Sequence, residues 1–405
     1  GCVPMHGITA TTRGSGKSGP GGAGLYPVLV ALGISFTVTP ATASQILRSV
    51  VGTESVRVAR ETLASHDLDL GHERTLRIVN HFGGRIVEQQ NKWYEEWEKK
   101  PILELKPGPL SGKRVAVAVD GGRVRLRVPN PGRPLANGHR RYEAPWKEPK
   151  ELTIYVIENA GQLDESFPVV LDGTLGDADA IFDRLVAYLK ALGAHEAELI
   201  IVLGDGAEWI WNRADVLAAR LGVSPEKLIQ IVDKYHAAQY LSETADLLQW
   251  NSDGEKKAWV EESKKLLIDG EALQLAEKID VAFAAVDGTS PKGEDLKKEI
   301  SDKTKPDRSS YFRDNAKRME YKKFLSLAYP IGSGAIESGI RRVINLRLKG
   351  AGKFWLEENA EHMIRMRSYL KAGRFLDLFL WSLTTAASWW RAPTDLLGRD
   401  KFATP

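Results

Sequence analysis

The chain has 405 residues, of which 43% are hydrophobic and 27% charged, so it can bury a core and wholesale disorder is excluded. The 56 Lys and Arg nearly balance the 53 Asp and Glu, and a net charge of +3 excludes a globally basic coat but not local basic patches. The single cysteine, Cys2, excludes a disulfide framework and a cysteine-rich zinc module and indicates a reducing compartment.

The apolar stretches are too short for membrane insertion. Residues 25–38 and 375–390 are interrupted by Pro, Gly or Asp and fall short of the roughly 18–20 apolar residues that span a bilayer. No secretory signal is visible, so we expect a cytoplasmic protein. Because the chain begins at Gly1 rather than Met, we allow for a segment upstream of it.

The N-terminal part is predicted to be helical after a flexible tail at residues 1–24. Within residues 25–100, apolar positions recur at helical spacing over 42–51, 54–64 and 72–82, where Gly83-Gly84 follows. A helix, a short glycine-containing turn and a second helix resemble the outline of a DNA-binding helix-turn-helix. An ordinary helical hairpin gives the same pattern.

The pattern changes to strands in residues 101–213, which we assign to the first part of an α/β domain. A linker at 101–113 precedes a buried strand at 115–119, and the Gly121-Gly122 turn predicts that residues 124–128 return as a β-hairpin. A polar loop is expected at 129–149. The remaining predicted elements are strands at 152–157, 167–171 and 199–203 and a helix at 177–192.

The rest of the chain is predicted to be almost entirely helical. Residues 214–327 show no convincing strand and form a helical insertion domain. Residues 328–380 contain helices at 335–348 and 356–370, separated by Lys349-Gly-Ala-Gly352, and complete the α/β domain before a C-terminal tail at 381–405.

Two predicted strands end in an aspartate that is followed by glycine, Asp120 and Asp205. A carboxylate at the end of a buried strand faces the crevice where α/β sheets bind ligands, and a nearby helix with a third carboxylate would complete a site for two Mg²⁺. Two such ions clamp the attacking and leaving oxygens of a phosphodiester displacement. Turn aspartates that only cap loops are the alternative, and Asp172-Gly173 is a third candidate of the same kind.

Glu337 is the candidate third carboxylate, on a helix entered through a glycine-rich segment. A Glu that only compensates the helix dipole is the alternative. Basic residues and an aromatic pair, Phe354-Trp355, follow it closely, as expected for contacts with phosphates and unstacked bases, although a solvated basic helix face would look the same. The basic residues are Arg341, Arg342, Arg347, Lys349 and Lys353.

Asp233 and His236 lie three residues apart on one predicted helix and can bind metal, position a proton or form a buried hydrogen bond. Two phosphate-binding patterns are rejected. Residues 14–18 resemble the end of a P-loop, but Thr11 stands where its first glycine belongs. Residues 173–176 lack the full glycine set of a dinucleotide turn and precede two aspartates.

Five motifs, in this order and spacing, resemble bacterial insertion-sequence transposases of the ISKra type, which are relatives of the Mutator-like DDE transposases. The resemblance covers residues 25–380. The motifs begin at Val119-Asp-Gly-Gly122, Gly204-Asp-Gly-Ala-Glu-Trp-Ile-Trp211, Asp233-Lys-Tyr-His236, Pro330-Ile-Gly-Ser-Gly334 and Arg347-Leu-Lys-Gly350.

The resemblance implies an RNase H-like mixed α/β fold that is interrupted by an all-α insertion and preceded by a helical DNA-binding region. It implies that Asp120, Asp205 and Glu337 form the DDE triad and hold two Mg²⁺, with Mn²⁺ able to substitute. Asp233 and His236 match the D-x-x-H element of the family, and His236 would position the scissile strand, protonate a leaving group or have a structural role. Lys349, Gly352 and Trp355 match the basic segment of the family. Members often begin with a cysteine-containing segment, of which only Cys2 is present.

The implied activity is metal-dependent DNA cleavage and strand transfer at the ends of an insertion sequence. The expected partners are double-stranded DNA, as terminal inverted repeats and target, and a second copy of the chain, because two ends must meet. The expected location is the nucleoid of a prokaryotic cytoplasm. Two alternatives remain open: a catalytically silent DNA-binding protein derived from a transposase, and a structure-specific nuclease of the same fold.

Overall fold

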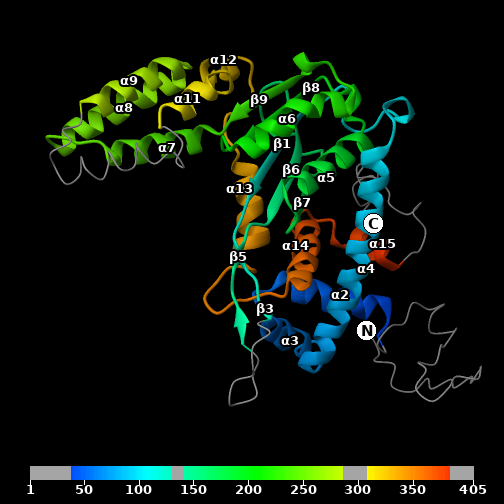
Figure 1. The fold of residues 1–405 in the computed structure, drawn as a ribbon. Helices are drawn as coiled ribbons and strands as arrows, with labels where there is room; N and C mark the ends of the chain where they lie inside the picture. Colours follow the sequence, from blue (N-terminus) through cyan, green and yellow to red (C-terminus); the bar gives the residue numbers. More distant parts are fainter. Residues whose placement is uncertain (1–37, 130–140, 286–307, 384–405) are drawn as a thin grey trace, which may run out of the picture. The chain divides into compact units, whose positions relative to one another are not determined.

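The computed structural model describes residues 38–129, 141–285 and 308–383, so both predicted tails lie largely or wholly outside the described residues (Figure 1). The fold is mixed α/β, and the chain divides into two compact units. Unit 1 takes residues 38–93, 123–129, 141–147 and 342–383. Unit 2 takes residues 94–122, 148–285 and 308–341.

Unit 2 is built on a five-stranded mixed sheet with the order β7-β6-β1-β8-β9. β6 and β7 are antiparallel to their neighbours, whereas β8 and β9 run parallel to β1. The strands are β1 (Arg114–Gly121), β6 (Lys150–Ile157), β7 (Val170–Thr174), β8 (Leu199–Gly204) and β9 (Leu228–Val232).

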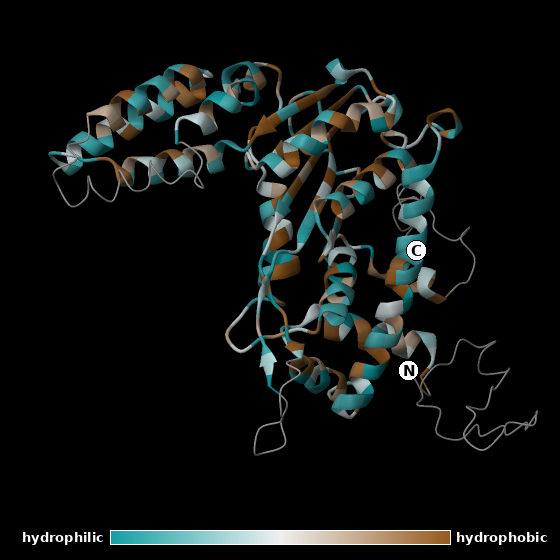
Figure 2. Cartoon of the chain, in the orientation of Figure 1, coloured by the Kyte–Doolittle hydropathy of each residue, from teal (hydrophilic) through white to brown (hydrophobic). Residues whose placement is uncertain are grey.

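The unbroken aliphatic runs of β1 and β8 arise because both faces of the sheet are covered by helices. Every residue of β8 is buried, and β1 is buried up to Val119. Figure 2 shows hydrophobic residues along these strands. The predicted strand at 199–203 is confirmed.

Three helices cover the sheet: α5 (Ala178–Ala191), α6 (Glu208–Leu221) and α13 (Gly334–Ile340). α5 begins where Asp177 accepts a hydrogen bond from the Ala180 amide, and it ends before Gly193 in the left-handed region, as the sequence predicts. Helix α5 packs against β6 and β7, and α13 packs against β1 and β6. Helix α5 contacts Asp172, which is paired with Leu152 of β6, whereas α13 contacts Glu151, the residue before Leu152. Because successive residues of a strand point to opposite faces, the two helices cover opposite faces of the sheet.

A helical insertion follows β9 within unit 2. Its α-helices in the described residues are α7 (Lys234–Leu247), α8 (Asp253–Asp269), α9 (Ala272–Ala284), α11 (Ser310–Asp314) and α12 (Tyr321–Ser326). The short 3-10 turns of unit 2 are Ile102–Glu104, Ala194–Glu196, Pro225–Lys227 and Ala316–Met319, and a π-helical turn, Arg341–Asn345, continues α13.

Unit 1 joins segments from three parts of the sequence. Its helices are α2 (Pro40–Gly52), α3 (Val56–Ala64), α4 (His72–Lys99) up to Trp93, α14 (Glu357–Lys371) and α15 (Phe375–Leu383). Its short strands are β2 (Val124–Arg125), β3 (Val128–Pro129), β4 (Tyr142–Glu143) and β5 (Trp146–Lys147). Among the described helices of both units, none is both long and apolar enough to cross a membrane.

The predicted hairpin between residues 115–119 and 124–128 is wrong. β1 pairs with β6 along its full length, and β2 pairs with β5 instead. All eight residues of β6 are buried, so this strand suits a central position beside β1, whereas Arg123, Arg125 and Arg127 alternate with apolar residues and stay exposed.

The prediction that residues 214–327 contain no strand is also wrong, because β9 lies there and adds to β8 in parallel. The predicted helix end at Gly83-Gly84 is wrong as well, since α4 continues to Lys99. A Cβ at Gly83 would come within 2.8–2.9 Å of the His362 ring of α14, so glycine serves close helix packing here rather than a break.

Candidate metal-binding active site

Asp120 and Asp205 lie at the same edge of the sheet. They follow β-paired Ala118 and Leu203 by two residues each, at the carboxyl ends of the parallel strands β1 and β8. Asp120 accepts a hydrogen bond from the Gly121 amide at 2.6 Å, and Asp205 accepts one from the Ala207 amide at 2.9 Å as the chain turns into α6. The sheet therefore brings these two predicted residues together.

Glu337 reaches the same region from α13. That helix lies directly on β1 and β6, and a Cβ at Gly339 would stand 2.8 Å from the Glu151 Oε1 atom, so a larger residue there would require the Glu151 carboxylate to move. The Glu337 carboxylate is half exposed and lies 3.7 Å from the Nε2 atom of His236 in α7. The predicted Glu and His therefore face each other.

The charges of this cluster act on Asp120. The pKa of the Asp120 carboxyl is raised to about 6, chiefly by burial and also by the carboxylates of Asp205 and Glu337, while the Gly121 amide and His236 oppose the shift. Because both carboxylates are felt at Asp120, the three acids of the predicted triad share one electrostatic site. Such a concentration of negative charge favours a divalent cation.

Asp233 performs a different task from the other acids. It is fully buried and follows β9, next to the end of β8. One carboxylate oxygen accepts the Tyr235 and His236 amides at 2.5 and 3.2 Å, which caps α7. The other accepts the Ser333 amide at 2.5 Å and the Ser333 hydroxyl. Asp233 thereby ties the helix of His236 to the segment that opens the helix of Glu337.

One compact set of ligand atoms belongs to Asp233, His236 and Glu337, which lie within 4.8 Å of one another. Four donors already occupy the lone pairs of the Asp233 carboxylate, so this residue would have to give up hydrogen bonds to bind an ion. Asp120, Asp205 and Glu337 contribute three carboxylates to one electrostatic site, and carboxylate oxygens are the ligands that hard divalent cations prefer.

Three residues without a motif signal lie beside the site. The Tyr311 hydroxyl of α11 donates to the Asp205 carbonyl oxygen at 2.9 Å, and its ring packs on Gly206, whose φ is +99°. Glu151, fully buried, is paired with Asp120 in the register of β6 and β1. Lys150 lies 4.2 Å from the Trp209 ring centroid. Lys150-Glu151 at the start of an otherwise apolar strand was the available signal.

Asp172, the third strand aspartate, is paired with Leu152, whereas Asp120 is paired with the preceding residue, Glu151. Since neighbouring residues of a strand face opposite sides, Asp172 lies on the opposite face of the sheet from Asp120. Its fully buried carboxylate accepts hydrogen bonds from the Tyr94 and Tyr188 hydroxyls at 2.5 and 3.2 Å. These bonds account for Asp172 as part of the core.

The predicted DNA-contacting residues lie in different environments. Arg341 and Lys349 are exposed, and Arg342, Lys353 and Trp355 are partly buried. Arg347 is 4% exposed and donates to the Glu54 carbonyl oxygen at 2.7 Å, and burial lowers its pKa to about 10. Its guanidinium stacks on Trp355, whose ring nitrogen donates to the Leu348 carbonyl oxygen. Arg347 has no surface left for a phosphate.

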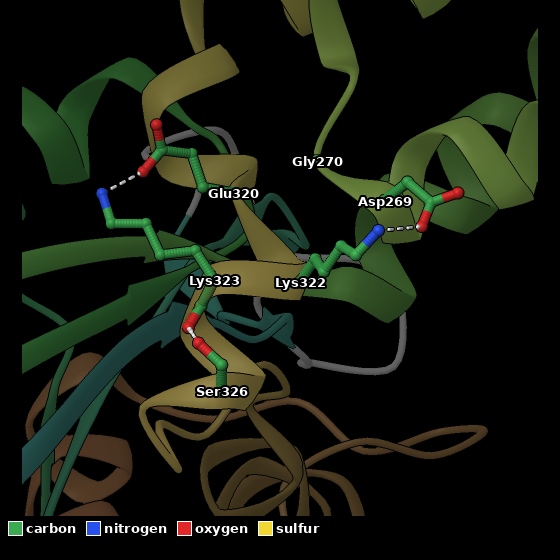
Figure 3. A pocket seen from close by; sticks show the side chains of 6 residues that line it. All are labelled: Asp269, Gly270, Glu320, Lys322, Lys323 and Ser326. Atoms are coloured by element: carbon green, nitrogen blue, oxygen red, sulfur yellow. Dashed lines mark hydrogen bonds and ion pairs between the residues drawn. The ribbon is translucent and has the colours of Figure 1, made fainter.

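A depression of about 390 Å³ lies elsewhere in unit 2, between the end of α8 and α12 (Figure 3). Its charges are paired, with Lys322 3.3 Å from Asp269 and Lys323 2.5 Å from Glu320. It holds none of the predicted catalytic residues. We therefore place the functional site at the carboxyl edge of the sheet, not in this depression.

Comparison of the chain with protein-family models, with curated proteins and with solved structures finds no match.

Proposed function

We propose that the chain is a DDE transposase that cleaves DNA and transfers its strands at the ends of an insertion sequence in a metal-dependent reaction. The observation that carries the proposal is the shared electrostatic site of Asp120, Asp205 and Glu337, built from two adjacent parallel strand ends and one helix. The motif resemblance named these three residues on independent grounds.

The order of the strands supports the finer proposal of an RNase H-like domain. Numbered along the chain, the five strands of the sheet lie side by side in the order 3-2-1-4-5, that is β7-β6-β1-β8-β9. The first three pair antiparallel with one another, and the last two run parallel to the first. The helical insertion interrupts this domain between the second aspartate and the glutamate. This arrangement agrees with the fold that the resemblance implies.

Asp120, Asp205 and Glu337 would hold the Mg²⁺ ions, whose chemistry is to activate the attacking oxygen and stabilise the leaving one. Mn²⁺ would substitute, because its preference for oxygen ligands is similar. His236, 3.7 Å from Glu337, would orient that carboxylate and the scissile strand. Asp233 would fix both residues through its two-sided hydrogen bonding.

Double-stranded DNA is the proposed partner, as terminal inverted repeats and as target, with a homodimer needed to hold two ends and the prokaryotic nucleoid as the location. Arg341, Arg342, Lys349 and Lys353 would contact phosphates, and Trp355 would stack on a distorted base. Arg347 would support Trp355 from the interior rather than bind DNA.

A nicking assay tests the proposal. The full chain is incubated with Mg²⁺ and DNA that carries insertion-sequence ends, alongside the Asp205→Asn variant. We expect cleavage by the wild-type chain and a loss of at least a thousandfold in the variant, because one ligand carboxylate is replaced by a neutral amide. Equal background cleavage by both proteins would refute the enzyme and favour the silent DNA-binding protein.

A strand-transfer assay with pre-cleaved ends then separates a transposase from a structure-specific nuclease. Joined products support the transposase. Cleavage of branched DNA without joining would replace it by the nuclease.

A further inference from the structure

A second feature, outside the acid cluster, is a ribbon surface in unit 1 formed by the β2–β5 and β3–β4 pairs. Val124 and Leu126 are buried on one face of this ribbon, while Arg125 and Arg127 between and after them are exposed on the other. Residues 123–129 and 141–147 together carry five basic residues and one acidic residue. The exposed face is therefore strongly positive.

Aromatic rings hold both arginines in place. The Arg125 guanidinium lies 4.8 Å from the ring centroid of Trp146, its cross-strand partner, and 5.9 Å from that of Phe354. The Arg127 guanidinium lies 4.6 Å from the Tyr142 centroid, and Tyr142 contacts Phe354 edge to face at 5.5 Å. We call these five residues the Arg–aromatic face.

The backbone fixes this face as well. Segment 354–355 adds to the ribbon: the Trp355 amide donates to the Arg125 carbonyl at 3.0 Å, and the Arg127 amide donates to the Trp355 carbonyl at 2.7 Å. The rings remain open to solvent, with Trp146 53% and Tyr142 42% exposed. A rigid, exposed and unusually basic surface of this kind is not explained by packing.

The guanidinium of each arginine lies over an aromatic ring, and its N–H groups can still donate to a ligand. No ion pair or hydrogen bond occupies the Arg125 or Arg127 side chain among the described residues. The N–H edge of a guanidinium matches two oxygens of a phosphate, and stacking lowers the entropy lost on binding. Alternate residues of an extended segment repeat about every 6.7 Å, close to two base steps of one DNA strand.

We propose that the Arg–aromatic face binds the sugar–phosphate backbone of duplex DNA, with Arg125 and Arg127 as the phosphate ligands. Lipid insertion is disfavoured because the rings are interleaved with arginines instead of forming an apolar patch. That the bound DNA is also the substrate of the acid cluster rests on the proposed function. The binding itself does not.

The test measures binding of a labelled 30-base-pair duplex to the full chain in EDTA, by fluorescence polarisation at several salt concentrations, in an Asp205→Asn background that cannot cleave. We expect Arg125→Ala/Arg127→Ala to weaken binding at least tenfold and to lower the salt slope by about two, since two phosphate contacts are lost. The control is Lys257→Ala/Lys265→Ala, which removes two exposed charges from α8.

Arg125→Lys/Arg127→Lys keeps the charges but loses the stacked, two-pronged donors, and we expect at least threefold weaker binding with the salt slope retained. If Arg125→Ala/Arg127→Ala binds DNA as tightly as the α8 control variant, the proposal is overturned. Arginine-dependent binding to phosphatidylglycerol vesicles with no effect on DNA would overturn it in favour of a membrane.

The two proposals fail separately. If the arginine variants weaken binding in EDTA but the wild-type chain does not nick DNA, only the proposed function is rejected. If the wild-type chain nicks DNA and the arginine variants bind it with unchanged affinity, only the proposed role of the Arg–aromatic face is rejected.

Discussion

Asp120 shows how one residue links the stability of the chain to the proposed metal site. Its carboxyl group has a pKa raised from 3.8 to about 6, chiefly by burial and then by the neighbouring acids. The folded state therefore favours the protonated carboxyl, whose stabilising contribution is present below pH 3.8 and is lost as the pH rises through 6. Above that pH, Asp120 is ionised, as a ligand for a cation must be, and its buried charge lowers the free energy of unfolding.

We predict that Asp120→Asn makes the metal-free chain more stable at neutral pH than the wild type. The advantage should grow between pH 4 and pH 7 by up to about 3 kcal/mol, which is the free energy of a shift of about two pKa units. Urea unfolding in EDTA at several pH values measures it.

Asp164→Asn is the matched control with the opposite sign. Hydrogen bonds from Ser166 lower the pKa of Asp164, so its ionised form stabilises the fold above pH 3.8 and this stabilisation is lost in acid. The Asn variant should lose stability at neutral pH. Parallel pH profiles for wild type and Asp120→Asn would contradict the prediction.

At the scale of elements, the site depends on the junction between β9, α7 and the segment before α13. Asp233 holds these three elements together with four hydrogen bonds from two directions. A further backbone bond, from the Lys234 amide to the Ile331 carbonyl at 2.9 Å, lies beside it. The acids need not be close in sequence, because the junction brings their elements together.

We predict that Asp233→Asn lowers the free energy of unfolding by about 2–4 kcal/mol, since the amide nitrogen of Asn cannot accept the bonds that a carboxylate oxygen accepts. Mg²⁺ affinity should also fall at temperatures where the variant is folded, because Glu337 and His236 lose their support. Calorimetric unfolding and metal titration measure the two effects. Ser333→Ala, which removes only the hydroxyl donor, should show a smaller loss, and an unchanged Mg²⁺ affinity in Asp233→Asn would exclude a positioning role.

At the scale of the whole molecule, unit 1 is assembled from segments that are remote in sequence. Arg367 of α14 is 2% exposed and donates to the carbonyl oxygens of Val51, Arg342 and Val343. Ile46 and Val50 of α2 are fully buried, and α2 packs on α14. The N-terminal helices therefore depend on residues near the other end of the chain.

We predict that Arg367→Met loosens α2, although the two are more than 300 positions apart in sequence. Three carbonyls would lose their donor, and the two buried ones, of Val51 and Val343, would each cost about 1–3 kcal/mol. Hydrogen exchange of the α2 amides should become ten- to a hundredfold faster, while α5 of unit 2 should exchange at its usual rate. Lys92→Met, at an exposed position of α4, is the control, and an unaffected α2 would show that unit 1 does not fold as one body.

Much of the α/β core could be predicted because its signals are local. The aliphatic run of β8, the capped helix α5 and the strand-end aspartates are all visible in short windows. The partner of β1 could not be predicted, since β6 lies beyond a loop and pairing is decided by burial on both faces. Helix α4 continues past Gly83 where it packs closely on His362, and this contact involves a residue too remote in sequence to be seen in a local pattern.

The candidate site divides in the same way. Asp120, Asp205 and Glu337 carry motif signals, whereas the supporting role of Tyr311 depends on how α11 returns to β8. Arg347 looks like its exposed basic neighbours in the sequence, and only its tertiary contacts show that it is interior. Local patterns identify reactive groups better than they identify the groups that hold them.

The insertion is joined to the carboxyl edge of the sheet at both of its ends. It leaves β9 at Asp233, and it comes back where the Tyr311 hydroxyl meets the Asp205 carbonyl and the Tyr321 hydroxyl meets the Val232 carbonyl at 3.0 Å. Movement of these helices would therefore act on the backbone beside Asp205 and Asp233. A partner that bound the insertion would reach the proposed site through this backbone, without any contact to its acids.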